Sequence, residues 1–331
     1  MTVKPPLVSI LVPAFNAERY LRQTLKSALS QSWKSKEIIV VDDGSTDGTL
    51  SLARRFESKR LKVITQKNSG ASAARNRALQ ESQGEYIQYL DADDLMDERK
   101  IELQLSLPKY CGDSDLCTCS SFYFYFNPKD AISLKNSLWK DLSAEEWLLR
   151  AARYGHWLPP HAWLVPRKAI EKAGPWDERL SLNDDGEYFF RLVANCCYVK
   201  FCPESSVFYR RANMSSLSSQ RSRMHLESLF SSVELSIAQL FAKLEKEVAV
   251  EVARYFIQYN VDKFKIEDSD ILKKFVALSE NLGGCVRPPT LSRKYRWTKV
   301  LVGKPTAELV ATKLDRLNHR IYCYLNRRRP K

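Results

Sequence analysis

Residues 7–56 read LVSILVPAFNAERYLRQTLKSALSQSWKSKEIIVVDDGSTDGTLSLARRF, and this stretch decides the fold. The apolar run 7–12 predicts a strand, and apolar side chains at helical spacing predict a helix over 17–31. A second apolar run, 37–42, predicts the next strand, and Ser45 is the expected cap of a helix over 46–56. The stretch therefore alternates strands and helices with short connections.

The alternation continues in the residues that follow. Strands are expected at 61–65 and 85–90, with a helix over 71–82 between them. Repeated strand and helix units predict a mostly parallel, Rossmann-like α/β sheet with helices on both faces. In an open sheet of this kind, ligands bind beyond the carboxyl ends of the strands. The residues just after each strand are therefore the first candidates for a binding site.

Those residues form a polar rim that suits a nucleotide. Carboxylates accept hydrogen bonds from base N–H groups or ribose hydroxyls, and a divalent ion held by carboxylates neutralises a diphosphate. In chain order, the rim consists of Pro13, Ala14, Phe15 and Asn16, then Asp42 and Asp43, then Lys67 and Gly70, and finally Asp91, Ala92, Asp93 and Asp94.

The two acidic clusters of the chain each allow two interpretations. Asp91, Asp93 and Asp94 would repel one another unless a cation or hydrogen-bond donors intervened, which makes a metal site reasonable. Asp184 and Asp185, which precede the apolar run 188–193, could contribute to catalysis. Either cluster could instead be the acidic first turn of a helix, where carboxylates are stabilising.

The second half of the chain predicts a different architecture. A Ser-rich linker at 215–222 places the end of the first domain at residue 219, and 220–331 is predominantly helical in its periodicity. The net charge is +13, and residues 285–331 hold 13 basic side chains but only Glu308 and Asp315 as acidic ones. The segment 305–331 predicts a basic amphipathic helix, which either contacts an anionic membrane surface or packs on the globular part.

Composition also indicates where the chain resides. No apolar run approaches the roughly 20 residues that a membrane-spanning helix needs, and residues 1–6 do not resemble a signal peptide. The eight cysteines lack CxxC and zinc-module spacing, which favours buried free thiols in a reducing compartment. We therefore expect a cytoplasmic protein with peripheral contact to the membrane face.

Five ordered strings resemble one known family, the inverting family 2 glycosyltransferases of the GT-A fold. They are VSILVPAFNAERYL, IIVVDDGSTDGT, NSGASAARNRAL, GEYIQYLDADD and GPWDERLSLNDDGEYFFRL, and together they cover about residues 5–215. Each string is short, but the ordered combination is highly specific. The resemblance implies a GT-A nucleotide-diphospho-sugar transferase domain at 1–219, followed by a helical extension at 220–331.

The resemblance also implies roles for particular residues. Asp185 falls at the catalytic base, with Asp184 as the second choice, and Asp91 to Asp93 match the DxD motif that binds Mn2+ or Mg2+. Asp93 would ligate the metal, and Asp91 would face the ribose or the metal's waters. The nucleotide-sugar site would comprise Pro13, Ala14, Phe15, Asn16, Asp42, Asp43, Lys67, Gly70, Arg75, Asp91 and Ala92.

The implied reaction moves one sugar from a nucleotide-diphosphate sugar to a hydroxyl of a glycan or lipid-linked acceptor. The broken match to QxxRW at Gln220 to Met224 and the lack of a span argue against processive synthesis. Many relatives carry a histidine near 209–213, where this chain has Arg210 and Arg211 as candidate diphosphate contacts. The aromatic and histidine side chains of 147–163 are candidates for acceptor contact, with His156 and His161 as alternative bases.

Two other classes of protein were weighed. A nicotinamide-dependent oxidoreductase fits the alternating pattern, but the turn after the first strand, PAFNAERY, lacks the GxGxxG that lets a backbone approach a pyrophosphate. A catalytically inactive nucleotide-sugar-binding or assembly protein of the same fold is the alternative that remains. The basic tail lacks any recognised nucleic-acid motif and clustered stacking aromatics, so no specific nucleic acid is expected as a partner.

Overall fold

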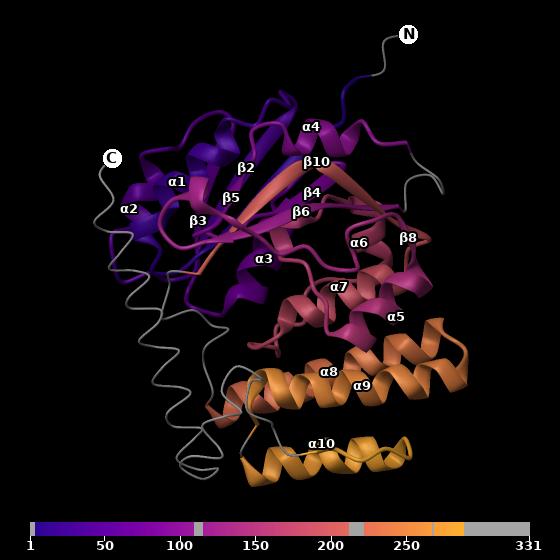
Figure 1. Ribbon diagram of the computed structural model, residues 1–331. Helices are drawn as coiled ribbons and strands as arrows, with labels where there is room; N and C mark the ends of the chain where they lie inside the picture. The colour runs from indigo at the N-terminus through magenta and orange to yellow at the C-terminus, as the bar shows by residue number, and fades with distance from the viewer. Residues whose placement is uncertain (1–3, 109–114, 212–221, 267, 288–331) are drawn as a thin grey trace.

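The computed structural model describes residues 4–108, 115–211, 222–266 and 268–287, which form two sheets with helices around them (Figure 1). The first sheet has the order β3-β2-β1-β4-β9. Its first four members are parallel, and β9 pairs antiparallel with β4. The strands are β3 (Leu61–Thr65), β2 (Lys36–Asp42), β1 (Val8–Ala14), β4 (Tyr86–Tyr89) and β9 (Val165–Pro166). The predicted mostly parallel α/β sheet is confirmed.

A second, mixed sheet extends the fold, in the order β5-β10-β6-β7, with β8 paired to β10. The long strand β10 runs parallel to β6, and the register shifts between Cys202 and Ser206. In the sequence, an apolar segment at 196–202 and the string VFYRR at 207–211 look like separate elements, but β10 contains most of both. The members are β5 (Leu95–Met96), β6 (Leu116–Phe124), β7 (Ile132–Ser133), β8 (Leu142–Ser143) and β10 (Tyr198–Arg210).

Helices cover the sheets as the apolar periodicity predicts. On α1, the side chains of Leu21, Leu25 and Ala28 are fully buried, because residues three and four apart share one helix face. The predicted cap at Ser45 is wrong: α2 begins at Thr49, and the Ser45 hydroxyl instead accepts a hydrogen bond from the Asn16 N–H. The helices are α1 (Glu18–Leu29), α2 (Thr49–Arg54), α3 (Ala71–Gln80), α4 (Lys100–Leu105), α5 (Ala144–Tyr154), α6 (Arg167–Ala173) and α7 (Asp184–Ala194), with short 3-10 turns at Pro128–Asp130 and Pro160–Ala162.

The described part of the C-terminal region holds three further helices: α8 (Arg223–Lys243), α9 (Lys246–Phe264) and α10 (Ser269–Asn281). Figure 1 shows α8 and α9 lying against α5 and α7, with α10 beyond them, and α7 contacts α8 while α5 contacts α9. Leu229, Val233 and Ile257 are fully buried at these contacts or between the helices. The predicted helical extension is therefore present. The predicted boundary at 219 and the tail 305–331 lie outside the described residues.

Two predictions about the chain's environment can be compared with the described part of the structure. Within that part, no helix is both long enough and apolar enough to cross a membrane. The six described cysteines are free, as predicted, but Cys197 and Cys285 are exposed rather than buried.

Candidate active site

The carboxyl ends of β1, β2 and β4 meet at one edge of the first sheet. Ala14 is in register with Asp42, and the Asp43 N–H donates to the Ala14 carbonyl at 2.8 Å. On the other side of β1, the Leu90 N–H donates to the Leu11 carbonyl at 2.9 Å, so Asp91 follows beside the end of β1. The parallel register therefore gathers the predicted rim, as the alternating pattern implies.

Asp43 organises the loop that follows β3. Its carboxylate accepts hydrogen bonds from Gln66 Nε2 at 2.8 Å and from the N–H groups of Ser69 and Gly70, both at 2.9 Å. Gly70 has φ +93°, a conformation that glycine adopts without strain. Both oxygens of Asp43 are thus used, although a carboxylate can accept about four hydrogen bonds. Lys67 and Gly70 are both exposed on this loop.

The turn after β1 combines a structural side chain with an exposed one. Asn16 has φ +47°, and its Oδ1 accepts from the Thr46 N–H at 2.9 Å, which ties the turn to the start of the β2 loop. The ring of Phe15 is 50% exposed and can cover a nucleobase. Asp42 is almost fully buried, and its Oδ1 lacks a hydrogen-bond partner among the described residues. Such an orphaned acceptor suits a ligand that donates.

Arg210 clamps the acidic turn that follows β4. Its main-chain N–H donates to Asp94 Oδ1 at 2.7 Å, and its Nε donates to the Asp93 carbonyl at 2.7 Å. The guanidinium lies over the rings of Tyr20 and Phe124, at 4.5 and 4.4 Å from their centroids. Burial lowers the pKa of Arg210, which is only 5% exposed. The side chain therefore orders the turn from within, whereas the sequence suggested a contact to diphosphate.

The acidic turn also offers ligands of the kind that a divalent cation takes. Asp91, Asp94 and His161 each place one ligand atom within 4.8 Å of the others, and Asp93 is half-buried beside them. His161 Nδ1 lies 3.1 Å from Asp94 Oδ2, yet neither atom makes a well-aligned hydrogen bond within the described residues. The carboxylates fit Mn2+ or Mg2+ in donor type, whereas an imidazole is a ligand more typical of other transition metals. Asp91 and Asp94 belong to the acidic cluster for which the sequence suggested a metal, although the family motif assigns only Asp91 and Asp93, and His161 is an addition.

His161 is unsuited to the role of alternative base. Its ring is fully buried and stacks on Tyr209 with centroids 6.4 Å apart. Burial lowers the pKa of His161 to about 3, so the imidazole is neutral at physiological pH. A general base must reach the hydroxyl that it deprotonates. His161 lies against Asp94 of the acidic turn, and its buried ring does not reach a hydroxyl at the surface.

Arg75 connects the acidic turn to the second acidic cluster. One terminal nitrogen donates to Asp91 Oδ1 and the other to Asp184 Oδ2, both at 2.8 Å. The guanidinium lies 4.3 Å from the centroid of the Trp176 ring, and the residue is 6% exposed. The carboxylates of Asp91 and Asp184 raise the pKa of Arg75 against its burial, so the cation is permanent. The structure thus joins two clusters that are 93 residues apart in the sequence.

Asp185 differs from its neighbour in what its carboxylate contacts. Asp184 accepts from Arg75 and, at 3.2 Å, from the Ser72 hydroxyl, whereas Asp185, among the described residues, accepts only from the N–H of Gly186, at 2.9 Å. Burial first, and the Asp184 charge second, raise the pKa of Asp185 to about 6. A half-buried carboxylate whose pKa is raised toward neutral pH, but which is still ionised at pH 7, suits a general base.

The C-terminal helices hold the loop that precedes Asp185. The Ser228 hydroxyl of α8 accepts from the N–H groups of Ser181 and Leu182, at 2.7 and 3.1 Å. One turn later on α8, the Ser232 hydroxyl accepts from Asn183 Nδ2 at 2.7 Å and donates to the Asn183 carbonyl at 2.8 Å. Asn183 has φ +60° and immediately precedes α7. These serines carry no motif, and the sequence analysis missed them.

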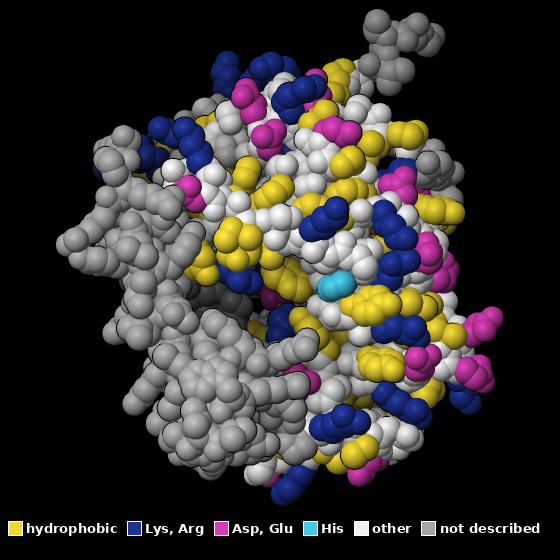
Figure 2. Space-filling model, in the orientation of Figure 1, with side chains coloured by type: hydrophobic (Ala, Val, Ile, Leu, Met, Phe, Trp, Pro, Cys, Tyr) yellow, Lys and Arg dark blue, Asp and Glu magenta, His cyan; other side chains and the backbone are white. Residues whose placement is uncertain are grey.

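The predicted acceptor aromatics separate into core and surface. Trp147 and Trp163 are packed in the core, while Trp157 is half-buried and meets Tyr209 edge to face with centroids 5.8 Å apart. Lys263, exposed near the end of α9, places its Nζ 5.6 Å from the Trp157 ring centroid. Figure 2 shows a recess on one face of the molecule, with hydrophobic, basic and acidic side chains around it.

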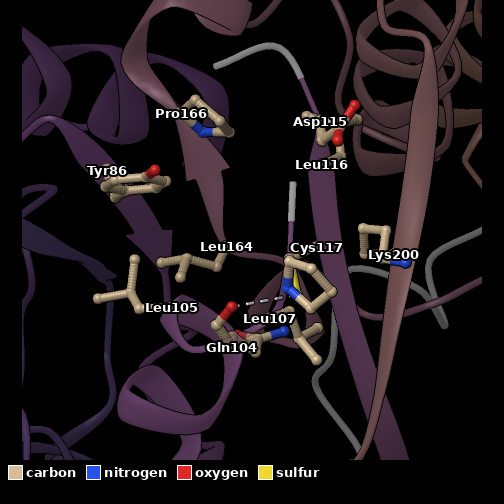
Figure 3. Close-up of a pocket in the computed structure, with 11 residues that line it drawn as sticks. Tyr86, Gln104, Leu105, Leu107, Asp115, Leu116, Cys117, Leu164, Pro166 and Lys200 are labelled. Atoms are coloured by element: carbon tan, nitrogen blue, oxygen red, sulfur yellow. Dashed lines mark hydrogen bonds between the residues drawn. The ribbon is translucent and has the colours of Figure 1, made fainter. Parts of the chain in front are cut away.

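Two other hollows lie away from these residues. A cavity of about 40 Å³, drawn in Figure 3, lies between the first residue of β4, Tyr86, and the first residues of β6, at the opposite end of the strands from Asp91. Its labelled lining is mostly apolar, with Asp115 and Lys200 at one side. A polar groove of about 280 Å³ runs along the outer face of α3, past Lys67 and Arg77. The cavity offers no arrangement of catalytic groups.

Comparisons with known proteins identify the family. Residues 9–173 match the model described as Glycosyl transferase family 2. Over 121 residues the chain is 40% identical to the cholesterol galactosyltransferase of Borreliella burgdorferi, a match that covers 36% of this chain and 33% of that protein. Over 108 residues it is 44% identical to the putative teichuronic acid biosynthesis glycosyltransferase TuaG of Bacillus subtilis, covering 32% and 43%. The chain thus spans a third to less than half of the length of these two relatives.

Solved structures agree on the fold. The crystal structure of S. aureus TarS 1–349 in complex with UDP has a TM-score of 0.64 and 20% identity, and the match covers 83% of this chain and 82% of that one. The complex of the same protein with UDP-GlcNAc has a TM-score of 0.67 and 18% identity, covering 83% and 80%. Because the family match contains β1 to β4 and the acidic turn, and the fold match extends over the C-terminal helices, this chain belongs to glycosyl transferase family 2 and has the GT-A fold.

Proposed function

We propose that this glycosyltransferase moves one sugar from a UDP-sugar to a hydroxyl of a glycan or lipid-linked acceptor, with inversion at the anomeric carbon. The observation that carries the proposal is the Asp184–Arg75–Asp91 bridge, which sets a weakly bonded Asp185 beside the DxD turn. The UDP complexes of the TarS fold neighbour support UDP as the nucleotide. Names such as galactosyltransferase and teichuronic acid glycosyltransferase among relatives support a glycan or lipid acceptor.

In the proposed reaction, Asp185 takes the proton of the acceptor hydroxyl as that oxygen attacks the anomeric carbon. The bond from this carbon to the diphosphate oxygen breaks, and UDP leaves from the opposite face, so the configuration inverts. General base catalysis of this kind contributes on the order of 100- to 10,000-fold. Asp184 is less suited to the role, because its carboxylate is occupied by Arg75 and Ser72.

The donor site is proposed at the rim of the first sheet. Phe15 would cover the base, and Asp43 would accept from it with the capacity that its loop contacts leave. A divalent ion would be held by Asp93 and Asp91, with Asp94 and His161 buried behind them. When bound, such an ion supplies positive charge that stabilises the diphosphate as it departs. The remaining rim residues, Pro13, Ala14, Asn16, Asp42, Lys67, Gly70 and Ala92, are proposed to line the nucleotide sugar.

The proposal also covers the domains of the chain and its contact with the membrane. We place the transferase domain at 1–219 and the helical region at 220–331, with peripheral membrane contact through 305–331 on the cytoplasmic face. The second candidate is a catalytically inactive nucleotide-sugar-binding protein. The joint presence of Asp43, Asp91, Asp93 and Asp185 in one edge of the fold favours turnover over this alternative.

Calorimetric titration of UDP, GDP and dTDP, each with and without Mn2+, tests the donor site. We expect metal-dependent binding of UDP that Asp93→Asn weakens. A panel of UDP-sugars is then assayed for slow UDP release in the absence of acceptor, which identifies the donor sugar. Binding of none of the three nucleotides would refute the donor site, and UDP binding without release from any sugar would favour the inactive protein.

A further inference from the structure

The contacts of Arg75 differ from those expected of a residue in the nucleotide-sugar site, to which the family resemblance assigns it. Both terminal nitrogens of its guanidinium are engaged by protein carboxylates, at 2.8 Å each, and its Nε is buried without a partner in the described structure. The Trp176 ring covers the guanidinium, and Trp176 in turn stacks on Tyr188 with centroids 4.0 Å apart. Little of Arg75 is left to contact a nucleotide.

The two carboxylates that Arg75 joins belong to different halves of the site. Asp91 belongs to the acidic turn that follows β4, and Asp184 begins α7 immediately before the proposed base. A planar guanidinium can hold two carboxylates in fixed directions, whereas an ammonium group is a point charge without that geometry. The same Arg75 charge, together with that of Lys263 from α9, also lowers the pKa of Asp185 against burial and the charges of Asp184 and Asp91.

From this geometry we propose that Arg75 is a positioning residue that couples the donor side of the site to the base: by holding Asp91 and Asp184 together, it withdraws Asp184 from catalysis and sets Asp185 toward the acceptor. This inference rests on the proposed function, because it assigns Asp185 as the base. It reassigns Arg75 from nucleotide contact to the carboxylate bridge.

The charge of Arg75 should weaken metal binding, although the bridge that Arg75 forms should favour turnover. Arg75 places a permanent positive charge beside Asp91, next to the proposed divalent ion, and like charges repel. Removing the charge should therefore strengthen Mn2+ binding, while losing the orientation of α7 should slow turnover. A nucleotide-contacting arginine predicts instead that UDP binding falls. A purely structural arginine predicts that metal binding and turnover fall together.

The experiment compares Arg75→Met and Arg75→Lys with the wild-type chain. Three quantities are measured: UDP affinity without metal, Mn2+ affinity of the UDP complex by calorimetry, and the rate of UDP release from the donor sugar. For Arg75→Met we expect unchanged UDP affinity, Mn2+ affinity higher on the order of fivefold, and UDP release slower on the order of 100-fold. Arg75→Lys should restore the Mn2+ affinity to the wild-type value but not the rate, because it keeps the charge and loses the fork.

Arg77→Met is the matched control, since Arg77 lies one half-turn further on α3, is exposed, and pairs with Glu81 at 2.8 Å. It should leave all three quantities unchanged. Circular dichroism and thermal melting establish that each variant is folded.

If Arg75→Met does not fold, Asp184→Asn replaces it, because it breaks the bridge from the other end and should also slow release at unchanged UDP affinity. A tenfold fall in metal-free UDP affinity for Arg75→Lys, or weaker Mn2+ binding in folded Arg75→Met, would overturn the proposal. Either result would leave the donor and base assignments standing, which Asp93→Asn and Asp185→Asn test separately.

Discussion

The substitution Asp185→Asn should lower turnover and raise the free energy of unfolding, so it separates the catalytic role of this residue from its effect on stability. Asparagine keeps the shape of the side chain but cannot take a proton, so turnover should fall on the order of 100- to 10,000-fold. UDP affinity should hardly change, because the Asp185 carboxylate accepts from the N–H of Gly186 and not from a residue of the donor rim. With the wild-type chain, turnover should rise with pH and level off above about pH 6, where Asp185 is ionised.

The effect on stability follows from the pKa of the same carboxyl. Burial and the Asp184 charge raise this pKa from an ordinary 3.8 to about 6 in the folded chain. Well below pH 3.8 the group is protonated in both the folded and the unfolded chain, so it costs nothing. Between about pH 4 and pH 6 the unfolded chain releases this proton while the folded chain keeps it, so the stability falls with pH and the loss is complete above pH 6. At about 1.4 kcal/mol per pH unit, the wild type should lose about 3 kcal/mol of unfolding free energy relative to Asp185→Asn.

Urea unfolding of both proteins at pH 4.5 and pH 8 measures this difference. Asp185→Asn should be markedly the more stable protein at pH 8, and the gap should narrow toward pH 4.5. Asp184→Asn is the matched contrast, because it leaves the buried Arg75 without one partner and should destabilise the chain at both pH values. Wild-type turnover in Asp185→Asn would refute the base assignment. Equal stability gaps at the two pH values would refute the explanation by a buried charge.

Three further predictions concern parts of the site and the tail. Asp93→Asn should weaken Mn2+-dependent UDP binding about tenfold while metal-free UDP binding stays unchanged. Calorimetric titration of UDP in the presence and in the absence of Mn2+ will show whether the loss of affinity occurs only when the metal is present. Arg210→Lys should cost about 2 kcal/mol of unfolding free energy, measured in urea, because a lysine cannot replace the fork that holds the Asp93 carbonyl and Gln23. Deletion of 305–331, which lies outside the described residues, should reduce sedimentation with anionic liposomes at physiological salt, and equal sedimentation of both forms would exclude membrane contact through this segment.

The first sheet was predictable because each of its strands carries its own local pattern. The strand expected at 61–65 is β3 within the same bounds, and the helix expected at 71–82 is α3 with two residues fewer. The second sheet was not, because β10 owes its length to pairing with β6 across a register shift that no short window of sequence contains. The Ser45 cap failed for a similar reason. A tertiary partner, the Asn16 N–H, uses the hydroxyl that local reasoning assigned to a helix.

In the candidate site, too, features set by local sequence were predictable and contacts between distant segments were not. The positions of Asp43, Asp91 and Asp185 relative to strand ends and the α7 start follow from local pattern. The contacts of Arg75, Arg210 and His161 do not, because each side chain contacts a segment at least 67 residues away in the chain. Arg210 illustrates the difference. Its residue type and place beside the acidic turn suggest a phosphate contact. In the structure, the rings of Tyr20 and Phe124 enclose the guanidinium, and its Nε donates to the main-chain carbonyl of Asp93.

The surroundings of Asp185 argue that the C-terminal helices are part of the catalytic machinery. The Asp184 carboxylate beside it is fixed by α3 through Arg75, and the loop before it is fixed by α8 through Ser228 and Ser232. Ser232 is fully buried and satisfies both the amide and the carbonyl of Asn183, a residue whose positive φ is otherwise strained. Neither support lies in α7 itself. The family match ends at residue 173, so it contains Arg75 and the donor rim, whereas Asp185 and the two serines that hold the loop before it lie beyond the match.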